Sequence, residues 1–170
     1  KGNVIHTVWY ADDWYQGSYK KDGGWSLELV DPMNPCGEAS NWKACANETG
    51  GTPGTVNSVK APNPDVYAPS VSRVGVNDAS HITVWFSETC DSANIQNAAS
   101  YTIDNGIGNP TAIITHSPDF SYAGLTLSTP LITGVVYTIT CTSTITDCAG
   151  NPMPANSTAR FAIPLAAAAG

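Results

Sequence analysis

Charged residues are scarce in this chain of 170 residues, where Asp, Glu, Lys and Arg make up 12%, about half the share in ordinary globular domains. Basic residues are the scarcer kind, with 7 against 14 acidic ones, and only Arg73 and Arg160 follow residue 60. A chain of net charge −7 without a basic stripe cannot neutralise a run of phosphates. The composition therefore argues against nucleic-acid binding.

Long apolar runs are missing as well. No stretch approaches the roughly 20 apolar residues of a membrane-spanning helix, so no membrane insertion is expected. The chain shows no signal peptide and does not start with Met. We interpret it as a mature or excised piece of a longer protein.

The sequence lacks the residue patterns that are typical of enzymes. The three histidines, His6, His81 and His116, lie far apart and form no zinc-ligand spacing. No serine stands in a G-x-S-x-G motif, and no glycine pattern of a nucleotide-binding loop occurs. The adjacent Asp12 and Asp13 are more typical of a turn than of acid–base catalysis. We therefore predict a non-catalytic protein with no catalytic, metal or cofactor site.

Four carboxylates leave a calcium site open as an alternative. Asp78, Glu88, Asp91 and Asp147 lie where loops of one domain end could gather, and carboxylate oxygens suit calcium. No EF-hand or repeat-type loop accompanies them, so solvated loops are the simpler interpretation.

Ser, Thr, Asn, Gly and Pro take the place of charges, and 42% of the residues are hydrophobic. In residues 135–142, Tyr137, Ile139 and Cys141 alternate with threonines, as in a strand with one buried face. Residues 81–88 form a second such strand, with Phe86 on its apolar face. We expect Phe86 and Tyr137 in a core, with the Tyr137 hydroxyl bonded to backbone near a turn.

Turn signals divide the second half of the chain into seven short strands, which is typical of an immunoglobulin-type sandwich. The expected strands are residues 71–76, 81–88, 101–104, 112–115, 125–127, 135–142 and 159–163, with a helical turn in residues 91–100. Upstream, residues 25–30 alternate as another strand.

Three prolines in residues 60–69 predict a stiff linker between two modules. The expected organisation is therefore a β module in residues 1–59, the linker, a β-sandwich in residues 70–165, and a low-complexity tail in residues 166–170.

The first module resembles the C-terminal half of the bacterial lamin-tail domain. The resemblance rests on Ser-Leu-Glu at residues 26–28, Trp42, and the Thr-Pro-Gly-x-x-Asn-Ser sequence at residues 52–58. It covers roughly residues 3–59, and the two-cysteine form is similar to versions in secreted proteins of Bacteroidetes-type bacteria. The family domain is Ig-like, so the resemblance implies an incomplete sandwich, whose missing strands come from upstream residues or from another chain.

The second module resembles the bacterial Ig-like domains that were first recognised in surface-layer proteins. The matching pieces are residues 86–88, 97–101, 125–127, 134–139 and 145–151. Together the two resemblances imply an all-β chain of tandem Ig-like modules and export, with the type IX secretion route as one possibility.

Five cysteines predict two disulfides and one free thiol. Cys36 and Cys45 flank a turn and are expected to pair. In an Ig-like sandwich the loops after the second and sixth strands share one end, so Cys90 is paired with Cys148. Cys141 faces the core as a buried thiol.

Two further residues are candidate sites. Trp85 lies opposite the apolar face of its strand, where it would be an interface anchor or, less favoured, a glycan platform. Ser92, in Asp-Ser-Ala, resembles short O-glycosylation sites of Bacteroidetes secreted proteins. The alternative is a helix N-cap at Ser92 or Asp91.

We interpret the chain as a structural or adhesive module of a large secreted or cell-surface bacterial protein, located outside the cell. Its expected partners are other domains or copies of that protein, with a glycan or protein ligand left open. The alternative is a carbohydrate-binding accessory module of a secreted enzyme, which needs a coplanar pair of exposed aromatic rings on one sheet face.

Overall fold

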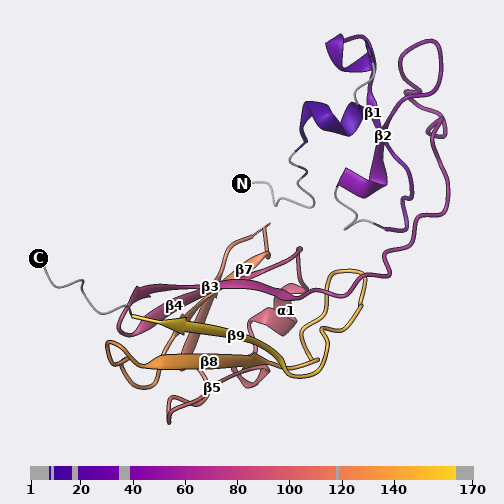
Figure 1. Ribbon diagram of the computed structural model, residues 1–170. Coiled ribbons are helices and arrows are strands. Elements are labelled where there is room, and N and C mark those ends of the chain that lie inside the picture. The colour runs from indigo at the N-terminus through magenta and orange to yellow at the C-terminus, as the bar shows by residue number, and fades with distance from the viewer. Residues whose placement is uncertain (1–7, 9, 17–18, 35–38, 118, 164–170) are drawn as a thin grey trace, which may run out of the picture. The chain divides into compact units, whose positions relative to one another are not determined.

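A computed structural model of the chain describes residues 8, 10–16, 19–34, 39–117 and 119–163 (Figure 1). It divides into two compact units, Lys1–Val66 and Tyr67–Gly170, and the division falls within the predicted linker 60–69. The predicted low-complexity tail at 166–170 lies outside the described residues.

The described residues of the first unit have little regular structure. Its two strands form an antiparallel pair in which Glu28 lies opposite Lys43, and short 3-10 helices precede and join them. In chain order the elements are η1 (Asp12–Tyr15), η2 (Tyr19–Asp22), β1 (Leu27–Leu29), η3 (Ala39–Asn41) and β2 (Trp42–Ala44). The predicted strand at 25–30 is present as β1. An Ig-like arrangement of this unit stays a prediction.

A buried carboxylate ties β1 to the segment that follows β2. Glu28 is only 5% exposed. Its carboxylate accepts hydrogen bonds from the Thr52 hydroxyl and from the backbone N–H and hydroxyl of Ser58, the last two at 2.7 Å. Burial by itself would raise the pKa of Glu28, but the hydrogen bonds from Thr52, Ser58 and Cys45 outweigh it and lower the pKa to about 2.

A second polar network centres on Asn41, which is fully buried. Its amide nitrogen donates to the backbone carbonyls of Asp31 and Asn34 at 2.8 and 2.7 Å, and its oxygen accepts from the Asp31 N–H at 2.9 Å. Asn63 joins the network, because its N–H donates to the Asp31 carboxylate at 2.8 Å and its side chain to Asn41 at 3.1 Å. The first residues of the predicted linker are thus hydrogen-bonded to the first unit.

The second unit is a β-sandwich of seven strands, which confirms the all-β fold class. One sheet has the order β3-β4-β7-β6 and the other β5-β8-β9, and all neighbours are antiparallel. The elements are β3 (Val71–Asp78), β4 (His81–Phe86), α1 (Ser92–Ile95), η4 (Ala98–Ser100), β5 (Tyr101–Ile103), β6 (Ala112–Thr115), β7 (Tyr122–Thr126), β8 (Val136–Cys141) and β9 (Ser157–Ala162).

The predicted strand at 125–127 is displaced in the structure. β7 begins at Tyr122, because strand pairing with β4 and β6 extends through Ala123 and Gly124. These small residues carry little strand propensity, so local pattern alone did not reveal the first half of β7.

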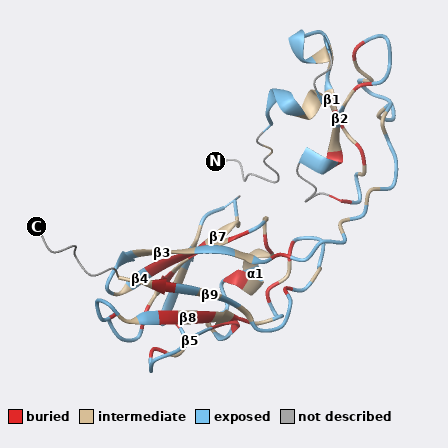
Figure 2. Ribbon diagram, viewed as in Figure 1, coloured by how far each residue is buried: buried red, intermediate tan, exposed pale blue. Residues whose placement is uncertain are grey.

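Buried apolar residues of both sheets form one hydrophobic core, and Figure 2 shows buried residues in red on strands of the sandwich. Phe86 and Tyr137 are 5% and 2% exposed, as their positions in the alternation predict. The Ile132 N–H donates to the Tyr137 hydroxyl at 2.9 Å, which confirms the predicted bond to backbone near a turn. Cys141 is a buried free thiol, also as predicted.

The first and last strands of the sandwich lie against each other, and Figure 1 shows β3 and β9 running in the same direction. The chain therefore enters the sandwich at one end and leaves it at the other.

Candidate functional site

A row of ring-bearing and cationic side chains crosses the outer face of the four-stranded sheet. Strand pairing places Arg73 beside Trp85 and Trp85 beside Tyr122. The Trp85 and Tyr122 rings are 6.5 Å apart at 32°, and the His116 ring lies 5.3 Å from Tyr122, also at 32°. Each ring is thus tilted rather than perpendicular to the next, so the row forms a nearly continuous aromatic surface.

Trp85 is held within this row by its own sheet. The Arg73 guanidinium lies over the indole, 3.5 Å from the ring centroid, which is the geometry of a cation–π contact. A Cβ atom on Gly75 would come within 2.8 Å of the same ring, so only glycine leaves space for the indole there. Trp85 faces outward from the core, and most of its ring surface is already in contact.

The adjacent row of the sheet contains two glycines. It consists of Gly75, Thr83, Gly124 and Ile114, which are neighbours across the four strands, and of these the Ile114 side chain is 63% exposed. Among the described residues, and apart from its two chain neighbours, the atom nearest to a Cβ placed on Gly124 is the Ile114 carbonyl oxygen at 3.6 Å. Gly124 therefore forms an open floor beside the taller aromatic row.

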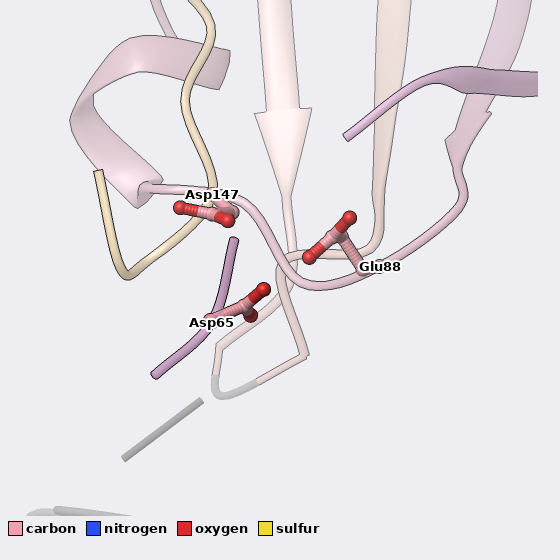
Figure 3. A group of neighbouring side chains, drawn as sticks. All are labelled: Asp65, Glu88 and Asp147. Carbon is pink, nitrogen blue, oxygen red and sulfur yellow. The ribbon is translucent and has the colours of Figure 1, made fainter. Parts of the chain in front are cut away.

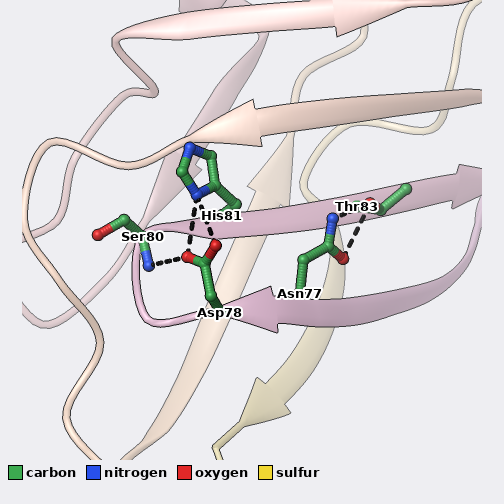
Figure 4. A network of polar contacts seen from close by, with 5 residues as sticks. All are labelled: Asn77, Asp78, Ser80, His81 and Thr83. Atoms are coloured by element: carbon green, nitrogen blue, oxygen red, sulfur yellow. Dashed lines mark hydrogen bonds and ion pairs between the residues drawn. The ribbon is translucent and has the colours of Figure 1, made fainter.

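Polar side chains from the β3–β4 turn border this floor (Figure 4). Asp78 accepts from the Ser80 N–H at 2.7 Å, and both of its oxygens lie 2.9 Å from Nδ1 of His81. The Asn77 amide lies 3.1 Å from the Thr83 hydroxyl. The hydrogen bonds from Ser80 and His81 lower the pKa of Asp78, so its carboxylate is a charged acceptor at neutral pH.

A groove of about 300 Å³ lies between the polar border and the Tyr122 and His116 rings, and Arg73, Gly75 and Trp85 are not part of its lining. We call it the sheet groove. Its lining combines aromatic rings, hydroxyls, an amide, two imidazoles and a carboxylate, from Asn77, Asp78, His81, Ile82, Thr83, Ile114, His116, Tyr122, Gly124, Leu125 and Thr126. The sequence pointed to none of these as one site, although Tyr122, Gly124 and Thr126 alternate with buried residues and so share a face.

The four carboxylates weighed as a calcium site do not gather. Asp78 belongs to the β3–β4 turn, and Asp91 caps α1. Glu88 and Asp147 do come together, and one oxygen of each lies within 4.8 Å of the other (Figure 3). Asp147 is 1% exposed and accepts bonds from the backbone and side chain of Asn151 at 2.8 and 2.7 Å. Glu88 and Asp147 can supply at most four of the six to eight oxygens that calcium takes.

The predicted disulfides Cys36–Cys45 and Cys90–Cys148 are absent, since Cys45 and Cys90 are buried free thiols. Cys148 is disulfide-bonded, but not to Cys90. The residue that pairs with Cys90 is Asp147, and adjacent residues in extended chain point to opposite sides. Cys90 therefore faces the core, while Cys148 is exposed.

The cysteine chemistry fits these positions. Burial, followed by the charges of Glu88 and Asp147, raises the pKa of Cys90 to about 12, and burial raises that of Cys141 to about 12. Both remain protonated and unreactive at neutral pH. Cys45 contacts the Ser58 hydroxyl at 3.4 Å, within the Glu28 network. Cys36 lies outside the described residues.

Asp91, rather than Ser92, is the N-cap of α1. Its carboxylate accepts from the N–H groups of Ala93 and Asn94, both at 3.0 Å, which is the N-cap arrangement. Ser92 is the first residue of the helix and is half-buried.

Comparisons with known proteins agree with this architecture. A family model for the bacterial Ig-like domain matches residues 58–162. The chain belongs to the bacterial Ig-like domain family. The sheet groove and the carboxylates Glu88 and Asp147 lie inside the matched residues of this domain.

Two solved structures are similar to part of this chain. They are the crystal structure of the S-layer protein rSbsC(31-844) and the structure of domains 1-6 of surface layer protein SbsC. Each has 25% identity and a TM-score of 0.50 over 56% of this chain, which corresponds to 14% of the other chain. A search of the curated proteins finds no match.

Proposed function

We propose that the chain is a non-catalytic structural module of a large cell-surface or secreted bacterial protein, in which it spaces neighbouring domains. The observation that carries this proposal is the parallel course of β3 and β9 (Figure 1). A sandwich that takes the chain in at one end and releases it at the other extends a row of domains lengthwise.

The family and the structural neighbours support the same role. Both similar structures are surface-layer proteins, in which the matched region is a small share of a long chain. A fold can carry many functions, so it is the sparse chemistry of this chain that favours a structural role. The described part of the chain holds no helix with the length and apolar character needed to cross a membrane.

We extend the proposal to the first unit as a lamin-tail-like module. Its support is the contact between two parts of the sequence resemblance, since Glu28 of Ser-Leu-Glu bonds Thr52 and Ser58 of the closing segment. Secretion by a Bacteroidetes-type bacterium, with the type IX route, belongs to this part of the proposal.

We also propose that the partners are other domains or copies of the larger protein, through adhesion or assembly into a fibre. Trp85, together with Arg73 stacked on it, is the candidate anchor, because aromatic and arginine side chains are enriched at interfaces. Ser92 stays a candidate glycosylation site only if modification tolerates its half-buried place in α1.

Surface labelling tests the main proposal. Antibodies raised against residues 58–162 should label intact cells of the source bacterium or detect the protein in its medium, and protease added to intact cells should remove the signal. A cytoplasmic protein serves as the control for lysis. A signal that appears only after lysis would overturn the proposal.

Light scattering during size-exclusion chromatography tests the assembly part separately. The 170-residue chain should show a mass that rises with concentration, and Trp85→Ala should reduce that rise. A strictly monomeric chain at all concentrations would eliminate self-assembly through this chain while leaving the spacer role intact.

A further inference from the structure

We propose that the sheet groove binds a short neutral saccharide of one or two sugar units. This inference is independent of the spacer role, because it concerns the outer face of one sheet and not the ends of the sandwich. Its basis is the combination of an open glycine floor, an aromatic wall and a border of hydrogen-bonding side chains.

The shape of the groove limits the size of its occupant. Its volume of about 300 Å³ is at the small end of ligand pockets, which run from about 300 to 1,000 Å³. The floor is the main-chain surface at Gly124 with the Thr83 hydroxyl beside it, and neither fills the space above the sheet. A second copy of this chain would need a protruding side chain to fill such a hollow, whereas a small ring-shaped ligand fits it directly.

The aromatic wall suits the apolar faces of a sugar ring. Tyr122 and His116 contribute two rings whose centroids are 5.3 Å apart and whose planes differ by 32°. Tyr122 is half-buried and His116 is exposed, so the wall is rigid at its base and accessible above. A sugar can place its C–H face on such rings while its hydroxyls point to the sides.

The opposite border supplies partners for those hydroxyls. Asp78 and His81 have side chains that are 60% and 51% exposed, and the Asp78 contact holds the imidazole by Nδ1, so that Nε2 is turned away from the carboxylate (Figure 4). Asn77, Thr83 and Thr126 add an amide and two hydroxyls. This set contains both donors and acceptors, as hydroxyl groups require.

The charges around the groove favour a neutral ligand. The carboxylate of Asp78 is already engaged by His81 and by the Ser80 N–H, and none of the described Lys or Arg residues lines the groove. In a chain of net charge −7, a phosphate or carboxylate ligand would meet repulsion without a cationic partner. An uncharged polyol is not repelled by the negative charge of the chain, and it needs no cationic partner.

Gly124→Val is the decisive variant. A Cβ at this position fits without a clash, and a β-branched residue is favourable in a strand, so the variant should fold while its side chain fills the groove. Thr140→Val on the outward-facing side of β8 is the matched control, because it places the same residue on the outer face of the other sheet. Thermal unfolding of both variants confirms that they are folded.

The probe is an array of neutral oligosaccharides, with hits titrated against the ¹⁵N-labelled chain by NMR. Wild type and Thr140→Val should bind the same glycans, with shifts centred on Tyr122, Gly124 and His116. Gly124→Val and Tyr122→Ala should each weaken binding at least tenfold. The inference is overturned if no neutral glycan binds, if Gly124→Val binds as wild type does, or if the groove amides shift with protein concentration alone, which would indicate a second copy as the occupant.

Discussion

Among its described residues the first unit buries three polar side chains, Glu28, Asn34 and Asn41, and only two apolar ones, Val30 and Cys45. The second unit has a core of 18 buried residues drawn from both sheets. A unit with two three-residue strands cannot remove much apolar surface from water. Buried polar side chains hold its loops instead, chiefly Glu28 through Thr52 and Ser58 and Asn41 through backbone groups of Asp31 and Asn34, whereas hydrophobic burial dominates the sandwich.

The two units should also differ in which substitutions destabilise them. Each intramolecular hydrogen bond contributes only about 0.5–1.5 kcal/mol net, but a buried polar group that loses its partner costs about 1–3 kcal/mol. The first unit should therefore be sensitive to single polar substitutions, and the second to loss of apolar volume.

The largest expected effect is in the sandwich core. Phe86→Ala should destabilise the second unit by roughly 3–5 kcal/mol, through lost burial and the cavity that remains. Urea unfolding followed by hydrogen exchange and mass spectrometry separates the two units by their peptides. Val136→Ala, at a residue that is 46% exposed, is the control. A loss below about 1 kcal/mol for Phe86→Ala would contradict the assigned core.

The second largest expected loss of stability is in the first unit, at the carboxylate of Glu28. Glu28→Ala leaves the Thr52 and Ser58 donors without their acceptor and should destabilise that unit by about 1–3 kcal/mol, with no change in the second. Glu48→Ala, at an exposed glutamate of the same unit, is the matched control. Equal protection of the first-unit amides in both variants would show that the Glu28 network does not hold the unit.

The pH dependence of folding stability should differ between the two units. The pKa of Glu28 is lowered from 4.5 to about 2 in the folded chain, so the unfolded state binds the proton more readily. The stability that Glu28 contributes is complete above the unfolded pKa and is lost as the pH falls through the folded pKa.

Hydrogen exchange between pH 5 and 2, corrected for intrinsic rates, measures this dependence. The first unit should lose stability over this range, and Glu28→Gln should make its profile flatter. An identical slope in wild type and Glu28→Gln would assign the acid sensitivity to other groups.

The smallest expected effect is a single hydroxyl of the sandwich. Tyr137→Phe removes the acceptor of the Ile132 N–H and should cost about 0.5–1.5 kcal/mol. Tyr10→Phe, at a residue that is 70% exposed, should have no effect. If Tyr137→Phe costs as much as Phe86→Ala, then the hydroxyl bond and not apolar burial dominates this part of the core.

Strand alternation in the sequence was sufficient to predict the sandwich, because a period of two assigns each residue to the inner or outer face without knowledge of the partner strand. It placed Phe86, Tyr137 and Cys141 in the core and Trp85 outside. The turn residues likewise predicted seven strands, since Asn, Asp and Gly end strands for local steric and hydrogen-bonding reasons.

Register and contacts between distant residues were decided by the tertiary structure. A shift of one residue pairs Cys90 with Asp147 and turns Cys148 outward, and loop position alone cannot detect such a shift. The sheet groove likewise exists only because β4, β6 and β7 bring Thr83, Ile114 and Gly124 into one row. These residues are up to about forty positions apart, and no local pattern records which strands become neighbours.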